Sequence, residues 1–302
     1  MRKTNDNTTL IPRTTFDGPS LAFHLPGVEV GVAEYDEGPT GCTVFKFGDG
    51  VSTAVDIRGG LVGASQTDYT WYNGICFAGG SLFGLEAASG VRAGMLDDDD
   101  HETGFNTIPQ VGAAILYDWF GRDNAIYPDV ALGRAAYHAA RSDVFPLGRR
   151  GAGRAAGMGQ GAAYRDAAGV KVAVFTVVNA LGNVVDRDGN VLTGSKRPTI
   201  DEINERIAEQ AAAPSQREGN TTLTVVATNR KMSHGSLTQM ARTVHSSMAR
   251  AIQPFHTESD GDVLFAVTTN EVDQEPPAVW ETAVIASELA WDAVLTSMPA
   301  DN

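Results

Sequence analysis

The stretch that organises this chain is EGNTTLTVVATN, residues 218–229, where a polar segment ends and a run of hydroxyl and apolar residues begins. A run of this kind, preceded by Gly and Asn, predicts a β-strand that starts at Thr221. The strand would therefore open with a hydroxyl residue directly after an Asn. The chemistry of that junction determines the rest of the interpretation.

Thr221 has the chemistry of a nucleophile if the peptide bond before it is cut. A Thr hydroxyl alone is a weak nucleophile, whereas a free α-amino group on the same residue titrates near about pH 8 and can take the hydroxyl proton. An ordinary Gly-Asn turn before a strand fits the same spacing. The chain contains its own comparison, because residues 7–10 repeat the tetrapeptide Asn-Thr-Thr-Leu of residues 220–223 in a terminal tail. A functional role for the second copy must therefore rest on its surroundings.

A second polar segment, HTESDGD at residues 256–262, precedes the last predicted strand. Its carboxylates at Asp260 and Asp262 flank one Gly and can hold an amine and orient a hydroxyl, and their mutual repulsion can raise the pKa of one of them. A solvated Asp-Gly-Asp turn is the alternative interpretation. A metal site that includes His256 is a poorer one, because the spacing matches no zinc motif.

The composition indicates one compact α/β unit. With 302 residues, of which 42% are apolar, the chain can bury a sizeable core. The net charge of -14 argues against nucleic acid or an anionic membrane surface as a partner. Cys42 and Cys76 are too few for a disulfide scaffold and are expected to be buried. No apolar run approaches the length of about 18 residues that a membrane span needs, and the start lacks an apolar signal, so we expect a cytoplasmic enzyme.

Apolar periodicity predicts alternating strands and helices along the chain. Asn179 would end one of these strands, at a position where side chains commonly serve function. The Gly-rich turn at residues 79–84 could present backbone N–H groups to an oxyanion. Strands are expected at 28–35, 42–47, 52–57, 75–78, 170–179, 221–229 and 263–269, a further apolar element at 111–120, and helices at 85–96, 132–140, 237–252 and 280–298.

Residues 184–220 differ in character from both flanks. A turn is expected at 186–190, and Lys196-Arg197-Pro198 interrupts any regular element. A capping box at residues 199–202 predicts a short helix that runs to about Ala213. We interpret the segment as a linker that ends in an exposed approach to Thr221.

Taken together, these motifs resemble the self-processing D-aminopeptidase and β-aminopeptidase family, and within it the branch of 6-aminohexanoate-oligomer endohydrolases, the nylon hydrolases. The resemblance covers nearly the whole chain from Phe23 onward. It is carried by Leu25-Pro26-Gly27-Val28, residues 37–41 (EGPTG), residues 55–60 (VDIRGG), Gly79-Gly80-Ser81 with residues 84–87 (GLEA), Gly219-Asn220-Thr221-Thr222, Thr228-Asn229 with Met232-Ser233, residues 244–248 (VHSSM), and residues 252–257 (IQPFHT) leading to Asp260-Gly261-Asp262.

The resemblance implies a cut between Asn220 and Thr221, which gives an α chain of residues 1–220 and a β chain of residues 221–302 within one compact domain. Thr221 would be the nucleophile for self-cleavage and for substrate hydrolysis. Asp260 and Asp262 would orient it and its amino group, Asn179 would assist the oxyanion, and Tyr117 would lie beside the substrate. The implied fold is a four-layer α/β/β/α sandwich of the N-terminal-nucleophile type, assembled as a homotetramer. No cofactor and no metal are expected.

One departure concerns the loop after Gly151-Ala152-Gly153. The nylon hydrolases carry a lysine there, whereas this chain has a shorter loop with Arg154. A guanidinium stays protonated and cannot exchange protons as an amine can. The role of the lysine therefore cannot be transferred to Arg154.

The leading hypothesis is an amidase that attacks the carbonyl of a small, linear, largely apolar amide or oligoamide through the hydroxyl of Thr221. A rival with the same fold would act on short peptides that begin with β- or D-amino acids. A rival from another class is an unprocessed homologue that acts as a binding or structural protein and has no catalytic activity. A third is a metal-dependent hydrolase built on His256, Asp260 and Asp262.

Overall fold

The computed structural model describes residues 1–193, 200–201, 204–205, 207, 219–275 and 277–298. The predicted helix between residues 200 and 213 falls largely outside this range. Within the described residues, the chain forms one mixed nine-stranded sheet and two small two-stranded sheets. In spatial order, the large sheet contains β4 (Ala64–Ser65), β6 (Val111–Ile115), β5 (Trp71–Ala78), β3 (Thr40–Ile57), β13 (Val263–Val272), β11 (Thr221–Arg230), β9 (Val170–Asn179) and β8 (Gly159–Ala167), and β2 (Glu29–Tyr35) also pairs with β3.

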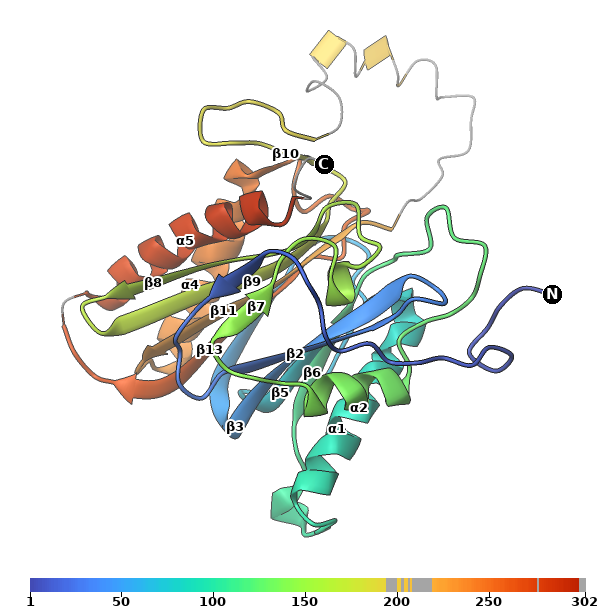
Figure 1. Cartoon of the computed structure of the whole chain (residues 1–302). Helices are drawn as coiled ribbons and strands as arrows, with labels where there is room; N and C mark the ends of the chain where they lie inside the picture. Colours follow the sequence, from blue (N-terminus) through green and yellow to red (C-terminus); the bar gives the residue numbers. More distant parts are fainter. Residues whose placement is uncertain (194–199, 202–203, 206, 208–218, 276, 299–302) are drawn as a thin grey trace.

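The longest strand, β3, connects the two halves of this sheet (Figure 1). Its first part pairs with β2 and β5, and its second part pairs with β13. The register against β5 shifts between Lys46 and Val51. The two strands predicted at 42–47 and 52–57 are therefore one strand, which continues through Gly48-Asp49-Gly50.

Three hydrophobic clusters separate four layers. One lies between the two halves of the sheet and contains Phe45, Phe77, Phe175 and Phe265. A second lies between β9, β11 and β13 and the helices α4 (His234–Ser247) and α5 (Val279–Thr296). The third lies under α1 (Glu86–Asp98) and α2 (Val130–His138) and includes Cys42 and Cys76, which are buried and form no disulfide.

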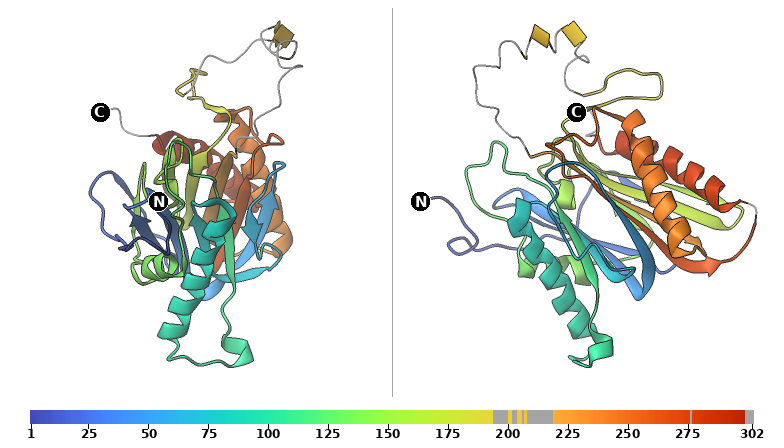
Figure 2. Two further views of the ribbon diagram at one scale, coloured as in Figure 1. Left: turned by 90° about the vertical axis from the view of Figure 1, so that its right-hand side faces the viewer. Right: turned by 180° about the vertical axis from the view of Figure 1, so that it is seen from behind.

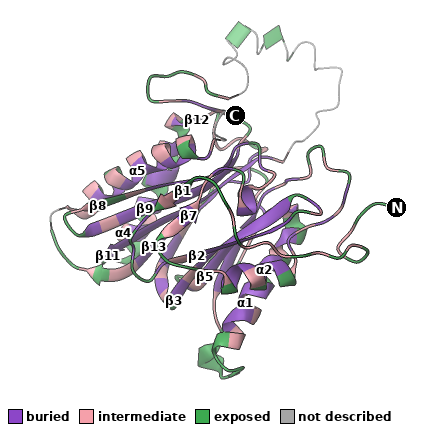
Figure 3. Ribbon diagram, in the orientation of Figure 1, coloured by how far each residue is buried: buried purple, intermediate pink, exposed green. Residues whose placement is uncertain are grey.

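The two helix pairs lie on opposite sides of the molecule, as the second view in Figure 2 shows. Buried residues are concentrated in the strands between them (Figure 3). The predicted four-layer α/β/β/α sandwich is therefore confirmed. No helix in the described residues is long and apolar enough to cross a membrane.

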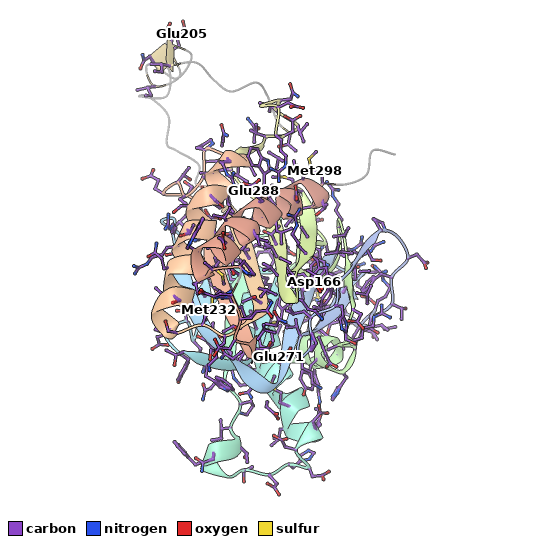
Figure 4. The ribbon with its side chains drawn as sticks, turned by 90° about the vertical axis from the view of Figure 1, so that its left-hand side faces the viewer. Asp166, Glu205, Met232, Glu271, Glu288 and Met298 are labelled. Atoms are coloured by element: carbon purple, nitrogen blue, oxygen red, sulfur yellow. The ribbon has the colours of Figure 1, made fainter. Side chains whose placement is uncertain are left out.

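Strand β8 is the main element that the sequence analysis missed. Its first half is GQGAA, which lacks the branched side chains typical of strands. The reason is a close helix contact, because a Cβ atom added at Gly161 would lie 2.0 Å from the carbonyl oxygen of Ala293 in α5. Small residues therefore let α5 approach β8. The same helix carries Glu288, labelled in Figure 4, which pairs with Arg250 at 2.7 Å and with Arg187 at 2.5 Å.

The remaining elements are short. They comprise β1 (Ser20–Ala22) paired with β7 (Val144–Pro146), β10 (Asn183–Val184) paired with β12 (Ile252–Gln253), and the 3-10 turns η1 (Ser81–Leu85), η2 (Phe105–Thr107), η3 (Gly151–Gly153) and η4 (Met248–Arg250). Serine and aspartate cap two of the α-helices: Ser233 accepts from the N–H of Ser236 in α4, and Asp129 accepts from the N–H of Leu132 in α2.

Candidate active site

The predicted site residues meet at one end of three neighbouring strands. Strand β11 runs antiparallel to β9 and parallel to β13, so the end of β9 lies beside the starts of β11 and β13. In this register Thr221 lies opposite Asn179, and Asn220 forms a bridge with Asp260. The side chains of all these residues are buried. The sheet topology therefore brings together positions that are 40 to 80 residues apart in the sequence.

The peptide linkage between Asn220 and Thr221 is held at its carbonyl oxygen. The backbone N–H of Gly261 donates to the carbonyl oxygen of Asn220 at 2.8 Å, and the hydroxyl of Thr221 donates to the same oxygen at 2.5 Å. A backbone N–H aimed at a carbonyl oxygen is the kind of donor that stabilises negative charge developing there. The hydroxyl therefore lies next to a carbonyl group that already has one such donor.

Gly261 allows this approach because it has no side chain. A Cβ atom at this position would lie 2.6 Å from the carbonyl oxygen of Leu61 and 2.9 Å from Oγ1 of Thr221. The first of these distances is shorter than any normal contact, and the neighbour is backbone. Gly261 therefore lets the Asp260-Gly261-Asp262 segment pass directly beside the hydroxyl.

Asn179 is fixed through both ends of its amide. Its Oδ1 accepts from the N–H of Gly157 at 2.9 Å, while its Nδ2 donates to the carbonyl of Tyr117 at 3.1 Å and to that of Gly219 at 3.5 Å. Tyr117 also lies against Gly219, where an added Cβ would be 3.0 Å from the Cβ of Tyr117. Asn179 and Tyr117 therefore contact the backbone just before the Asn220–Thr221 linkage.

Asp262 holds the backbone that follows Thr221. Its Oδ1 accepts from the N–H of Thr222 at 2.7 Å, and its Oδ2 receives Nδ1 of His256 at 2.9 Å. Burial raises the pKa of Asp262 above its ordinary value, although the hydrogen bond from His256 opposes this effect. The buried carboxylate of Asp262 therefore fixes the backbone at the start of β11.

Asp260 stabilises the loop that contains it through hydrogen bonds. Its Oδ2 accepts from the N–H and the hydroxyl of Thr257 at 2.9 and 2.7 Å, and its Oδ1 accepts from the N–H of Leu181 at 3.4 Å. Within the described residues, neither Asp260 nor Asp262 forms a hydrogen bond with the hydroxyl of Thr221. Any direct contact with the α-amino group of Thr221 would require that group to be released first.

His256 has a different place from the one considered in the metal hypothesis. It donates to Asp262 rather than converging with both carboxylates, and the described residues contain no group of three or more His, Cys, Asp or Glu arranged to hold a metal ion. Behind His256 lies a second buried pair that the sequence did not indicate, in which Nδ1 of His245 lies 2.8 Å from Oδ2 of Asp56. These two residues come from α4 and β3, so only tertiary structure could reveal the pair.

Arg154 is engaged away from this site. Its guanidinium forms ion pairs with the buried Glu34 at 3.2 Å and with Asp36 at 3.1 Å. Burial raises the pKa of Glu34, although the N–H of Gly151 and the charge of Arg154 act in the opposite direction. Arg154 therefore stabilises the loop at η3, and within the described residues it forms no hydrogen bond or ion pair with Thr221.

The Gly-rich turn at residues 79–84 does not provide an oxyanion site. The N–H of Gly80 donates to the buried Asp118 at 2.9 Å, and the N–H of Ser81 donates to the carbonyl of Leu116 at 2.9 Å. The N–H groups of Gly80 and Ser81 therefore fix the turn itself. Asp118 in turn pairs with the buried Arg122 at 2.7 Å.

Exposed apolar side chains lie close to the buried polar site. Leu61 and Leu181, whose backbone N–H groups both bond to Asp260, are 42% and 47% exposed. On the other side, the ring of Tyr117 packs against Phe120, which is 50% exposed, at 5.0 Å between centroids, and against Trp119 at 5.9 Å. Several exposed apolar and aromatic side chains therefore lie near Thr221 in the described part of the chain.

The whole architecture matches solved structures of amide-cleaving enzymes. It superposes on a β-aminopeptidase from Burkholderia sp. with a TM-score of 0.65 and 15% sequence identity, over 93% of this chain and 88% of that chain. It superposes on an L-aminopeptidase D-Ala-esterase/amidase from Ochrobactrum anthropi, described as a variant of the Ntn hydrolase fold, with a TM-score of 0.67 and 14% identity, over 94% and 88% of the two chains. The protein therefore has the fold of the Ntn-hydrolase-type aminopeptidases.

Sequence similarity then gives the family. The model of peptidase family S58 matches residues 23–299. A 6-aminohexanoate-oligomer endohydrolase from Paenarthrobacter ureafaciens is 44% identical over 319 residues, which cover 96% of this chain and 89% of the relative. The chain belongs to peptidase family S58 and is a hydrolase that acts on amides.

Proposed function

We propose that this protein is a self-cleaving amidase that cuts its own Asn220–Thr221 bond and then uses Thr221 to hydrolyse internal amide bonds of linear oligoamides of the 6-aminohexanoate type. The observation that carries the proposal is the geometry of this linkage. The Asn220 carbonyl oxygen receives both the Gly261 N–H at 2.8 Å and the Thr221 hydroxyl at 2.5 Å.

Self-cleavage would proceed by transfer of the acyl group from nitrogen to oxygen. Oγ1 of Thr221 attacks the carbonyl carbon of Asn220, the C–N bond to Thr221 breaks, and the hydroxyl proton ends on the released amino group. The N–H of Gly261 stabilises the negative charge on the carbonyl oxygen during this step. Water then hydrolyses the ester, which leaves a carboxylate on Asn220 and restores the hydroxyl.

Substrate hydrolysis would repeat the same steps on an external amide. The free amino group of Thr221 takes the hydroxyl proton, an acyl-ester forms on Oγ1, and water releases the product. Asp260 and Asp262 orient Thr221 and its amino group. Asn179 supports the oxyanion, and the N–H of Gly261 is available for it once Asn220 has moved away. These roles need no cofactor.

Two features support a linear, apolar substrate. The relative with 44% identity is named for its action on 6-aminohexanoate oligomers, whose repeating unit is an apolar chain between amide groups. Exposed Leu61, Leu181 and Phe120, together with Tyr117, provide apolar surface near the site. Apolar side chains of this kind fit the methylene segments of such a chain.

The cleaved chains would remain together because their strands alternate in the sheet. Strand β11, which would start the β chain, pairs with β9 of the α chain, and β13 pairs with β3 of the α chain. Residues 1–220 and 221–302 thus share the large sheet of one domain. We also propose a homotetramer of such protomers, for which the exposed Trp280 and Val284 on α5 offer apolar contact surface. Light scattering should then give about four times the 31.9 kDa of one chain.

The test of self-cleavage is the intact mass of Thr221→Ala. We expect wild-type protein to yield fragments of 220 and 82 residues (302 − 220 = 82) and the variant to stay a single chain. Thr8→Ala is the matched control, because it removes the equivalent hydroxyl from the first Asn-Thr-Thr-Leu copy and should leave processing intact. Two fragments from Thr221→Ala would end the proposal.

The rival substrate class is short peptides or amides with N-terminal β- or D-amino acids. The fold similarity to the Burkholderia β-aminopeptidase keeps it as the second candidate. Turnover of a 6-aminohexanoate oligomer should exceed that of a β-alanyl amide if the proposed substrate is right. The reverse ranking would favour the aminopeptidase. An unprocessed homologue is the remaining alternative, since Arg154 is held by Glu34 and Asp36, and a wild-type chain of undivided mass would support it.

A further inference from the structure

His256 connects the carboxylate of Asp262 to a buried cluster that the proposed chemistry does not use. The two oxygens of Asp262 are divided between two donors: Nδ1 of His256 at 2.9 Å and the N–H of Thr222 at 2.7 Å. Asp262 is fully buried, and the side chain of His256 is 15% exposed. Because a carboxylate only accepts, Nδ1 of His256 must carry the proton in this contact.

The ring of His256 is held on two sides. Its centroid lies 3.8 Å from that of Phe255, with an interplanar angle of 32°, and 4.3 Å from that of His245, with an angle of 83°. Its backbone has φ of 60°, a left-handed conformation that His and Asn adopt more readily than most residues. Both the packing and the backbone therefore point the ring at Asp262.

His245 is itself fixed from behind. Its Nδ1 lies 2.8 Å from Oδ2 of Asp56, and the same oxygen receives Nε of Arg58 at 2.7 Å. Burial lowers the pKa of His245 to about 4, although Asp56 opposes this effect, so the ring is neutral near pH 7. A neutral ring beside a carboxylate donates through Nδ1. The row from Arg58 to Asp262 thus places two histidines between two aspartates.

We propose that His256 is a positioning residue that holds Asp262 in register with the N–H of Thr222, and through it sets the position of Thr221, while the His245–Asp56 pair holds the ring of His256. The inference rests on the proposed function, since it concerns the same nucleophile. His256 touches neither the Asn220 carbonyl nor Oγ1 of Thr221 in the described structure. Its effect is therefore transmitted through Asp262.

This arrangement has a consequence for pH dependence. The groups that face Asp262 are His256, the N–H of Thr222 and the carboxylate of Asp260. Burial and Asp260 raise the pKa of Asp262, whereas His256 and the Thr222 N–H lower it. Without the hydrogen bond from His256, less would oppose the increase in the pKa of Asp262. Asp262 would therefore become protonated at a higher pH. If the reaction requires ionised Asp262, the acid limb of its pH–rate profile must then move to higher pH.

The experiment compares His256→Ala with His256→Asn. Both variants remove the ring, but the side-chain N–H of Asn lies close to the position of Nδ1 and Asn tolerates the left-handed backbone. We expect His256→Ala to slow self-cleavage and kcat by about ten- to a hundredfold, the usual effect of losing a hydrogen bond to a charged group, with KM little changed. The acid limb of kcat should move to higher pH. His256→Asn should recover at least part of both effects.

His138→Ala is the matched control, because His138 also contacts an aspartate, with Nε2 3.1 Å from Oδ2 of Asp97, on the far α1–α2 face. It should leave the cleavage rate and the pH profile unchanged. Equal rates in His256→Ala and His256→Asn with an unmoved acid limb would overturn the inference, since only general damage would then explain the loss.

A second measurement separates this inference from the proposed function. In the Thr221→Ala precursor labelled with ¹⁵N-histidine, we expect a downfield, slowly exchanging Nδ1–H signal from His256 that disappears in the double variant with Asp262→Ala. Its absence in the precursor would overturn the positioning role, whatever the activity. Its presence in a wild-type protein that never cleaves would leave the contact intact and remove the proposed function alone.

Discussion

The two copies of Asn-Thr-Thr-Leu in this chain have the same side chains and very different surroundings. In the first copy, residues 7–10, Asn7 and Thr9 are exposed, and the hydroxyl of Thr8 donates only to the side chain of Asn7 at 3.1 Å. In the second, residues 220–223, every residue is buried, and the hydroxyl of Thr221 meets the carbonyl of Asn220 beside the N–H of Gly261. The reactivity that we propose for Thr221 would therefore come from these surroundings and not from the tetrapeptide itself.

The surroundings of the second copy come from two separate segments. Asp260, Gly261 and Asp262 approach from the start of β13, and Asn179 approaches from the end of β9. Each supplies a hydrogen bond to the backbone on one side of the Asn220–Thr221 linkage. Removing any one of these contacts should slow cleavage at the second copy. Its rate should then approach that of the first copy, at which we expect no cleavage.

The largest effect is expected from Gly261→Ala. The new Cβ would lie 2.6 Å from the carbonyl oxygen of Leu61 and 2.9 Å from Oγ1 of Thr221, so the segment must shift and its N–H must leave the carbonyl of Asn220. Loss of a single oxyanion donor costs about a hundredfold or more in rate. We expect self-cleavage to slow by at least about that factor, measured as the fraction of intact chain over time by mass spectrometry.

Gly48→Ala is the control for this substitution. A Cβ at Gly48 in β3 meets no heavy atom within 4 Å, so the variant should cleave at the wild-type rate. If Gly261→Ala also cleaved within about twofold of the wild type, the close passage of this segment would not be what distinguishes the second copy.

Much of the framework of this edge could be predicted from the sequence. The apolar runs at 170–179 and 221–229 match β9 and β11 almost to the residue, because buried central strands are continuous and apolar. The positions of Asn179 at a strand end and of Asp260 and Asp262 before a strand were correct as well. These features are local, and local patterns report them.

The sequence could not predict the features that depend on tertiary contacts. Strand β8 was not predicted because its glycine at position 161 is unusual for a strand. This glycine is needed for the close packing of α5 against β8. Asp56 and His245 are 189 residues apart, so their pairing leaves no local signal. The same holds for Arg154, which follows η3 and whose partner Glu34 is on β2. Such contacts depend on which buried side chains are brought together by the fold. The spacing of residues along the sequence does not contain this information.

The second prediction concerns the buried support behind the second copy. The pKa of His245 is lowered from 6.5 to about 4 in the folded protein, chiefly by burial, so the unfolded chain binds more protons between these pH values. The free energy of unfolding should therefore rise with pH from about 4 to 6.5, by at most about 3 kcal/mol. In His245→Leu this part of the slope should disappear, as measured by urea unfolding of the uncut Thr221→Ala chain at pH 4.5 and 6.5. Parallel pH dependence in the two proteins would contradict the assignment of a neutral, buried His245.

The smallest effect is expected from Asn179→Asp, which keeps the shape of the side chain. The carboxylate can still accept from the N–H of Gly157, but it cannot donate to the carbonyls of Tyr117 and Gly219 and would face them with like charge. Loss of a neutral hydrogen bond costs about 1 kcal/mol, so we expect self-cleavage to slow by about fivefold. Asn179→Ser, which retains a hydroxyl donor on a shorter side chain, should cleave faster than the Asp variant. If Asn179→Asp cleaved as fast as the wild type, the contact with Gly219 would not help to hold the linkage, and the contrast between the two copies would rest on β13 alone.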